Sequence, residues 1–125
     1  MSAIALDRAL DETTDRSNYI ESISNKGGLR VAGLNSDVQA FCCLDRTYFF
    51  GRRFISLLSV SPSARRAGLG LGLLMDSARG EAEVWTSTNR SNTPMQTLLA
   101  RAGWRCCGEV SGLDAGDPER FYRTP

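Results

Sequence analysis

The chain has 125 residues, which is enough for one domain with a buried core and too few for two. Fifteen basic residues against fourteen acidic ones give a net charge of +1, so the clustered basic excess of a general nucleic-acid binder is missing. The sequence contains no histidine, which excludes imidazole bases, Ser-His-Asp triads and histidine-ligated metal sites. We expect a single domain over residues 1–125 that has no nucleic-acid partner.

The four cysteines form two adjacent pairs, Cys42-Cys43 and Cys106-Cys107. Zinc ligands are usually spaced as C-x-x-C, which is absent, so no metal is expected. Neighbours on a strand point to opposite faces, so each pair is expected to give one buried and one outer thiol. Met1 to Leu10 lacks the pattern of a signal peptide, and the longest apolar-rich stretch, Ala67 to Met75, is too short to span a bilayer. We therefore expect a cytoplasmic protein without a membrane partner.

The first half of the chain predicts one helix and three strands. Residues 1–14 are expected to be irregular or partly helical. The apolar spacing from Ser17 to Asn25 predicts a short amphipathic helix that ends at the following glycines. Asp45 to Arg53 is interpreted as a mixed connection. The three strands are expected at Leu29–Leu34, Val38–Leu44 and Phe54–Val60.

The second half predicts an alternation of helices and strands. Pro94 suits the first turn of a helix, and Gly103 suits its end. Gly112 to Pro118 reads as an acidic turn. The elements are expected as a helix at Leu69–Arg79, a strand at Glu83–Thr86, a helix at Pro94–Ala102, and strands at Trp104–Ser111 and Glu119–Arg123. The resulting order predicts an α/β fold.

The segment between Val60 and Leu74 combines a strand end, basic residues, glycines and a helix start. Backbone N–H groups at a helix N-terminus bind anions, and glycine lets a phosphate approach the main chain. Arg65 and Arg66 can offset phosphate charge. Leu73 stands where the dinucleotide fingerprint G-x-G-x-x-G needs its third glycine. The G-K-S/T that ends a nucleoside triphosphate loop is also absent. The segment therefore predicts a diphosphate site of another kind.

The spacing R-x-x-G-x-G, carried by Arg65, Gly68 and Gly70 after a strand ending V-x-P, resembles the pyrophosphate signature of the GCN5-related N-acetyltransferases, the GNAT family. A second match is the family's N-x-x-A/M-x-x-L helix ending in glycine and an aromatic residue, here Asn92, Met95, Leu98, Gly103 and Trp104. The stretch TSTN-x-SN-x-PMQ from Thr86 to Gln96 is similar to a small bacterial branch. The resemblance covers about residues 19 to 123.

The resemblance implies a mixed, mostly antiparallel sheet with two splayed parallel strands and helices on both faces. The family's first strand is expected to be missing or incomplete. It also implies acetyl-coenzyme A as cosubstrate, with backbone groups of the strand holding the pantetheine arm, loop amides holding the pyrophosphate, and Asn92 near the thioester. The cofactor-binding residues implied are Leu58, Ser59, Val60, Arg65, Arg66, Ala67, Gly68, Leu69, Gly70, Leu71 and Asn92.

The usual catalytic groups of the family are replaced here. Leu99 stands where many members have a tyrosine, and Leu57 and Leu58 stand where many have a glutamate. The remaining acid or base candidates are Ser91, Tyr122, Tyr48 and Glu119. Asp114, Asp117 and Glu119 could attract a cationic amine or form only a solvated hairpin. Tyr48 could line the acceptor pocket or simply pack.

The function implied is N-acetyl transfer from acetyl-coenzyme A to a primary amine of a small molecule, peptide or protein. The alternative is a non-catalytic module of the same fold that binds or senses acyl-coenzyme A. A third reading is an interaction domain with an empty loop. Because the front of the chain is short, the acceptor site is expected to be open, completed by a second copy in a homodimer, or inactive.

Overall fold

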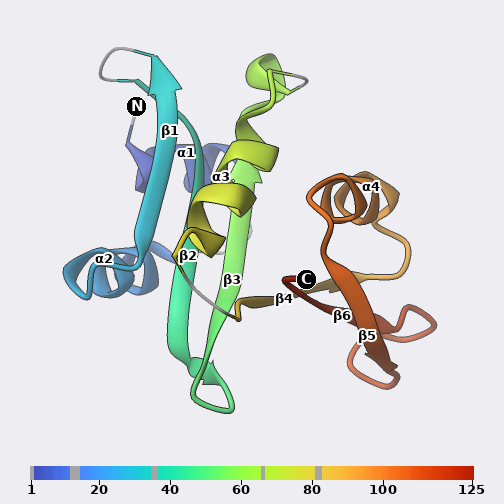
Figure 1. The fold of residues 1–125 in the computed structure, drawn as a ribbon. Coiled ribbons are helices and arrows are strands. Elements are labelled where there is room, and N and C mark those ends of the chain that lie inside the picture. The colour runs from blue at the N-terminus through green and yellow to red at the C-terminus, as the bar shows by residue number, and fades with distance from the viewer. Residues whose placement is uncertain (1, 12–14, 35–36, 66, 81–82) are drawn as a thin grey trace.

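The computed structural model describes residues 2–11, 15–34, 37–65, 67–80 and 83–125 (Figure 1). Its elements are, in chain order, α1 (Ala3–Leu10), α2 (Ser17–Asn25), β1 (Leu29–Leu34), β2 (Asp37–Phe49), β3 (Arg52–Val60), a short 3-10 helix η1 (Pro62–Ala64), α3 (Leu69–Ala78), β4 (Trp85–Asn89), α4 (Thr93–Arg101), β5 (Arg105–Val110) and β6 (Glu119–Arg123). The strands form one sheet in the order β1-β2-β3-β4-β6-β5. Among the strands of the described residues, the β3–β4 pair alone is parallel. The predicted α/β class and mostly antiparallel sheet are confirmed.

Beyond shifts of a single residue at several element ends, three segments differ from the sequence-based expectation. The segment before Ser17 contains a full helix, α1, with Ser2 as its N-cap. Asp45 to Arg53 is not a mixed connection, because β2 continues to Phe49 and β3 begins at Arg52. The strand expected at Glu83–Thr86 lies later, at Trp85–Asn89. The absence of the family's first strand stays a prediction.

Helices cover both faces of the β1-β2-β3 half of the sheet (Figure 1). Alternate residues of β2 enter different cores, as strand geometry requires. Phe41 and Cys43 pack with Leu6, Ile20 and other side chains of α1 and α2. Ala40, Cys42 and Leu44 pack on the other face with Leu73 and Leu74 of α3. The prediction of helices on both faces is therefore confirmed.

The cysteine expectation was wrong for both pairs. Cys42 and Cys43 are both buried, because β2 is covered on its two faces. Cys106 and Cys107 are both exposed, because β5 is an edge strand whose six residues are all exposed. Successive side chains of a strand point to opposite faces of the sheet. Whether a side chain is buried then depends on whether a helix covers that face.

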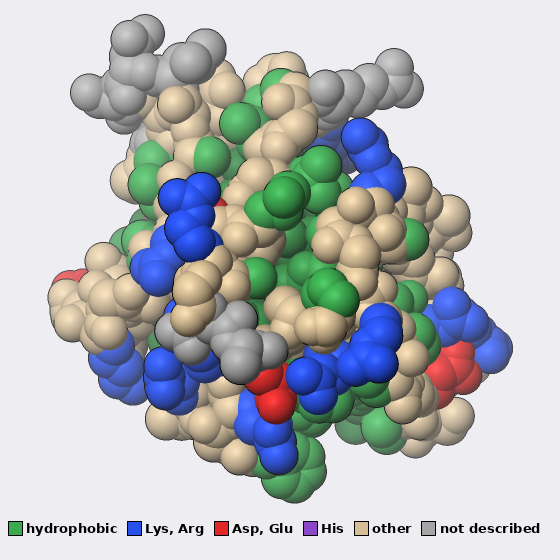
Figure 2. All heavy atoms as spheres, viewed as in Figure 1, with side chains coloured by type: hydrophobic (Ala, Val, Ile, Leu, Met, Phe, Trp, Pro, Cys, Tyr) green, Lys and Arg blue, Asp and Glu red, His purple; other side chains and the backbone are tan. Residues whose placement is uncertain are grey.

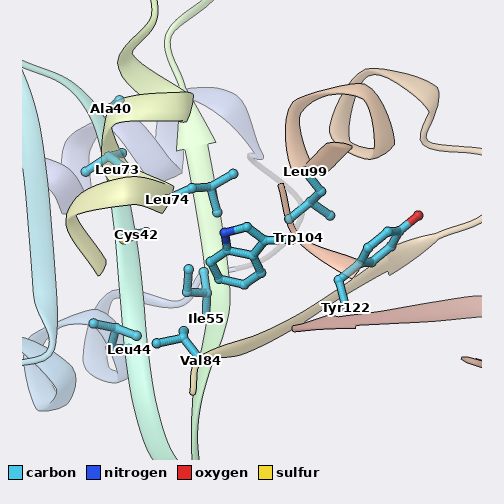
Figure 3. Close-up of a cluster of buried hydrophobic side chains, with 10 residues drawn as sticks. All are labelled: Ala40, Cys42, Leu44, Ile55, Leu73, Leu74, Val84, Leu99, Trp104 and Tyr122. Carbon is cyan, nitrogen blue, oxygen red and sulfur yellow. The ribbon is translucent and has the colours of Figure 1, made fainter. Parts of the chain in front are cut away.

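One core joins the two halves of the sheet (Figure 3). Trp104 lies between Leu74 and Ile55 on one side and Leu99 and Tyr122 on the other. These residues come from α3, α4, β3, β6 and the position just before β5, so the core holds the β4-β6-β5 half against β3. None of the described helices is long and apolar enough to cross a membrane.

Candidate functional site

Strands β3 and β4 touch at one end and separate toward the other. They pair only at Phe54–Trp85 and Ile55–Thr86. Thr86 Oγ1 also donates a hydrogen bond of 2.9 Å to the Ile55 carbonyl, which closes this end. Beyond Ile55, β3 pairs with β2 alone. The predicted splay of two parallel strands is present, with its vertex at Ile55.

A β-bulge in β3 lies directly beside this vertex. Cys43 of β2 pairs with Leu57, and the next residue, Leu44, pairs with Ile55. Ser56 is therefore the extra residue, and a bulge of this kind bends the strand that carries it. The bend accounts for the divergence of β3 from β4 after two paired positions.

The backbone groups of β3 alternate between β2 and the splay. Ser61 N donates to the Gln39 carbonyl at 2.7 Å, so in an antiparallel ladder Ser59 also bonds toward β2. The N–H and C=O of Leu58 and Val60 consequently face the splay. Of the three strand residues expected to hold a pantetheine arm, Leu58 and Val60 have the right backbone orientation, and Ser59 faces the other way.

Four amides at the start of α3 have no helical partner. Gly68 is the N-cap in a left-handed conformation, with φ of 79°, which favours glycine. The first helical hydrogen bond runs from Gly72 N to the Gly68 carbonyl at 2.9 Å. This leaves the amides of Gly68, Leu69, Gly70 and Leu71 without intrahelical acceptors.

The residues before Gly68 contribute less than the sequence suggested. The Ala67 N–H donates to the Ala64 carbonyl at 3.2 Å, so it is used inside the loop. Arg65 is exposed and can approach an anion from solvent. Arg66 lies outside the described residues.

The missing side chain of Gly70 has a packing role that the sequence did not show. A Cβ built on Gly70 would lie 3.0 Å from Leu98 Cδ2 and 3.5 Å from Val60 Cγ2. Glycine therefore permits the close packing of α3 on α4 and β3. The Gly70 N–H belongs to the first turn of α3, and its expected contact with a phosphate stays a prediction.

Asn92 and the carboxylates of the acidic loop make hydrogen bonds within the protein. Asn92 Oδ1 accepts the Met95 N–H at 3.2 Å as the N-cap of α4. Asp117 accepts from the Ser91 amide at 3.0 Å and from the Ser91 hydroxyl at 2.6 Å. Asp114 accepts from Asn89 Nδ2 at 2.8 Å. These bonds give Ser91, Asp114 and Asp117 a structural explanation, and their proposed contacts with substrate stay predictions.

The remaining candidates do not converge on one point. Glu119 Oε2 accepts from Ser87 Oγ at 2.8 Å, near the far end of β4. Tyr48 is 64% exposed and stacks on Phe54 with ring centroids 5.1 Å apart, below the vertex. Tyr122 is buried in the core, with its hydroxyl pointing away from Trp104 (Figure 3).

A partly buried polar network at the vertex was missed by the sequence analysis. The Tyr19 hydroxyl of α2 donates to Asp45 Oδ2 at 2.6 Å and makes a short hydrogen bond with Ser56 Oγ. Asp45 Oδ1 accepts from the Thr47 amide at 2.8 Å and from its hydroxyl at 2.7 Å. The residues are 26 and 37 positions apart, so no local spacing links them. The only signal was a carboxylate directly after the apolar run of β2.

This network holds a charge at the vertex. Burial alone would raise the pKa of the Asp45 carboxyl, but the hydrogen bonds from Tyr19 and Thr47 outweigh it and hold the pKa below its usual value. Burial, together with the bond to Asp45, raises the pKa of Tyr19 well above its usual value. Asp45 is therefore ionised and Tyr19 protonated at neutral pH.

Aromatic rings line the same face of the sheet below the vertex. Phe49 contacts Phe54, Trp85 and Phe121 with ring centroids 5.0 to 5.3 Å apart. Sheet register puts Trp85 and Phe121 on the face opposite α3, because their neighbour Tyr122 belongs to the α3 core.

The α3 side of the molecule is hollowed. Hydrophobic side chains gather between α3 and the α4–β5 region, with basic side chains around them (Figure 2). A groove of about 420 Å³ there is lined by Met75, Ala78, Arg79, Ala102, Trp104, Thr124 and Pro125. The described residues contain no group of three or more side chains able to hold a metal ion.

Solved acetyltransferases share this architecture. An acetyltransferase of the GNAT family from Bacillus cereus ATCC 10987 matches with a TM-score of 0.88 and 32% identity, over 97% of this chain and 86% of that chain. The yncA protein of Salmonella typhimurium, solved with its cofactor acetyl-CoA, gives 0.71 and 20%, over 96% and 83%. A ribosomal-protein-alanine N-acetyltransferase from Brucella melitensis gives 0.71 and 21%, over 98% and 90%.

The fold and the splayed strands are those of the GNAT class. The identity and coverage of the Bacillus cereus match go further than a shared fold, and the chain belongs to the GNAT family. The chain matches no protein-family model and no curated protein.

Proposed function

We propose that this protein binds acetyl-coenzyme A in the splay of β3 and β4 and transfers the acetyl group to a primary amine. The observation that carries the proposal is the proximity of two sets of backbone groups that have no partner within their own helix or ladder. The four amides at the start of α3 suit a diphosphate, and the outward-facing groups of Leu58 and Val60 suit an extended amide chain such as pantetheine.

The acetyl thioester of the bound cosubstrate supplies the activated acyl group. An acceptor that arrives as an ammonium first releases its additional proton to solvent. The neutral amine nitrogen forms the new bond to the acetyl carbon, the C–S bond breaks with its electron pair going to sulfur, and one amine proton ends on the thiol. The chain must position the amine and accept its N–H groups. Leu99 cannot donate to the sulfur, because its side chain carries no hydrogen-bond donor.

The face of the sheet opposite α3, called here the acceptor face, favours an amine. Its oxygens near the splay belong to Ser56, Ser87 and Glu119, and they can accept hydrogen bonds from N–H groups. The aromatic rings of Phe54 and Phe121 lie beside them, and rings of this kind attract cations. Both features fit a cationic or N–H-bearing acceptor.

Binding is tested by a pair of substitutions at Gly68. Asparagine and aspartate both tolerate the left-handed conformation and cap helices well, so Gly68→Asn and Gly68→Asp should both fold. Only aspartate repels a diphosphate. We expect calorimetry with coenzyme A to show at least a roughly tenfold weaker Kd for Gly68→Asp than for Gly68→Asn. Gly72→Ala is the control, because a Cβ there meets open space.

Turnover is tested with acetyl-coenzyme A and a panel of primary amines: benzylamine, spermidine, free lysine and a peptide with an N-terminal alanine. Release of the coenzyme A thiol and a product heavier by one acetyl group are the expected readouts. Equal affinity of the two Gly68 variants would refute the loop assignment. Binding without turnover of any amine would refute the enzymatic proposal while leaving the binding site intact.

A further inference from the structure

The polar network at the vertex joins three elements at the point where β3 leaves β4. Tyr19 comes from α2, Asp45 from the end of β2, and Ser56 from the bulge of β3. Asp45 is 6% exposed, whereas Ser56 is only half-buried. The network therefore runs from an interior carboxylate outward to a hydroxyl that a ligand can reach.

The hydrogen positions in this network follow from the number of donors. The Tyr19 hydroxyl has one hydrogen, and it is donated to the Asp45 carboxylate. Ser56 must then donate its own hydrogen to the Tyr19 oxygen in the bond that joins them. The Ser56 oxygen is left as a hydrogen-bond acceptor, and the Asp45 charge fixes it in that role.

Ser56 also lies where the reacting end of the cosubstrate is expected. Val60, next to the loop that suits the diphosphate, is four residues from Ser56, or about 13 Å along an extended strand. A pantetheine arm, built from pantoyl, β-alanyl and cysteamine units, spans a comparable length. Its sulfur would then reach the vertex, with the Ser56 side chain on the acceptor face beside α2.

We infer that Ser56 Oγ accepts an N–H of the acceptor amine and so aims the nitrogen lone pair at the thioester, and that Tyr19 and Asp45 are positioning residues that hold Ser56 as an acceptor. This inference rests on the proposed function, because it assumes a bound acetyl-coenzyme A. It assigns the amine contact to a residue at the bulge instead of a carboxylate base.

A purely structural role for the network makes a different prediction. Tyr19 ties α2 to the sheet, so its loss alone could lower stability and leave the chemistry intact. Ser56→Ala separates the two roles, because it removes the outer hydroxyl and keeps the bond between Tyr19 and Asp45. Ser56→Thr restores a hydroxyl and should restore function.

The experiment measures three quantities for the wild type, Ser56→Ala, Ser56→Thr and Tyr19→Phe: kcat, coenzyme A affinity, and affinity for the best amine of the panel in the presence of coenzyme A. We expect Ser56→Ala to lower kcat and weaken amine affinity by roughly five- to thirtyfold, as loss of one hydrogen bond does, with coenzyme A affinity unchanged. Tyr19→Phe should resemble it. The double variant Tyr19→Phe/Ser56→Ala should lose little more than either single one, because both act on one contact.

Ser24→Ala, an exposed serine of α2, is the matched control and should behave as the wild type. Thermal melting of each variant shows whether it folds. A Ser56→Ala protein with wild-type kcat and amine affinity would overturn the inference, and so would Ser56→Thr failing to recover either quantity. If the wild type binds coenzyme A but acetylates no amine, the enzymatic proposal fails, and an unaltered amine affinity in Ser56→Ala then removes this inference separately.

Discussion

The two cysteines of each adjacent pair share the same exposure, but one pair is buried and the other is exposed. Burial raises the pKa of the Cys43 thiol to about 12, and burial also raises the pKa of Cys42. The thiolate is the reactive form, so both are protected by sequestration and by their protonation state. Cys106 and Cys107 are exposed on the edge strand β5.

We expect two of the four thiols to react quickly with an aromatic disulfide reagent at neutral pH in the folded protein. The other two should react only after denaturant is added. Mass spectrometry of the labelled peptides identifies the sites, and Cys106→Ser/Cys107→Ser should abolish the fast phase. Rapid labelling of the peptide containing Cys42 and Cys43 would show that β2 is not covered on both faces.

Leu99 stands where the resemblance to the GNAT family leads us to expect a tyrosine, and the packing around it opposes that substitution. Leu99 is fully buried among Leu74, Trp104 and other core residues. A tyrosine there would overpack the core and bury a hydroxyl. We expect Leu99→Tyr to lower the free energy of unfolding by about 1–3 kcal/mol in a urea titration.

The matched control at this position is Leu99→Met, which keeps the volume and should cost less than about 1.5 kcal/mol. Leu99→Tyr should not raise kcat at a concentration where the protein stays folded. A stable Leu99→Tyr protein with faster turnover would mean that position 99 faces the reacting sulfur, which its burial contradicts.

At the scale of elements, α1 and α2 are joined by a buried ion pair. The Arg16 guanidinium, just before α2, donates to both carboxylate oxygens of Asp7 in α1. The Asp7 side chain is 1% exposed and that of Arg16 is 29% exposed. The pair thus places a charge in the α1–α2 core that needs its partner.

Removing only the cation should cost more than removing both charges. We expect Arg16→Met to lower the free energy of unfolding by about 1–3 kcal/mol, because Asp7 is then buried without its donor and water reaches it only partly. The double variant Arg16→Met/Asp7→Leu should recover part of that loss. Urea titrations of the wild type, Arg16→Met and the double variant measure the free energy of unfolding of each. A double variant less stable than Arg16→Met would refute the argument.

The sequence predicted most elements because their signals are local. The spacing of apolar residues in α2, Asn92 and Pro94 at the start of α4, and the loop before α3 each depend on a few neighbouring residues. The β2–β3 hairpin was missed because its turn is Phe50-Gly51, both at positive φ, in place of the usual Asn-Gly signal. Tyr48 and Phe49, which were expected in a mixed connection, lie at the end of β2, and Phe50 begins the turn.

The candidate site divides in the same way. The loop before α3 has a motif in consecutive residues, so the sequence alone could propose it as a diphosphate site, and that assignment stays a prediction. The contact that a Cβ on Gly70 would make with Leu98 was not visible in the motif. The Tyr19–Asp45–Ser56 network depends on how α2 docks and on a bulge in the pairing of β2 with β3. Neither can be read from spacing, because both follow from contacts between distant segments.

At the scale of the whole molecule, the sheet consists of two halves with a weak backbone connection. Two parallel pairs at the vertex and the core around Trp104 join β3 to β4, whereas β2 and β3 are paired along most of their length. The backbone groups of Leu58 and Val60 have no strand beside them on the splay side. A bound pantetheine arm would act there as an added strand.

This arrangement predicts where coenzyme A slows amide exchange. Leu58 and Val60 should gain protection on binding, because their N–H groups face the splay, whereas Leu57 and Ser59 already bond toward β2. Ligand at 100 times its Kd stabilises the whole fold by about 2.7 kcal/mol, which slows every amide that exchanges by global unfolding. The test therefore compares Leu58 and Val60 with Ala32 of β1, using NMR hydrogen exchange with and without coenzyme A. Equal slowing at all three positions would show that the arm does not pair with β3, since only local bonding can protect Leu58 and Val60 beyond the global effect.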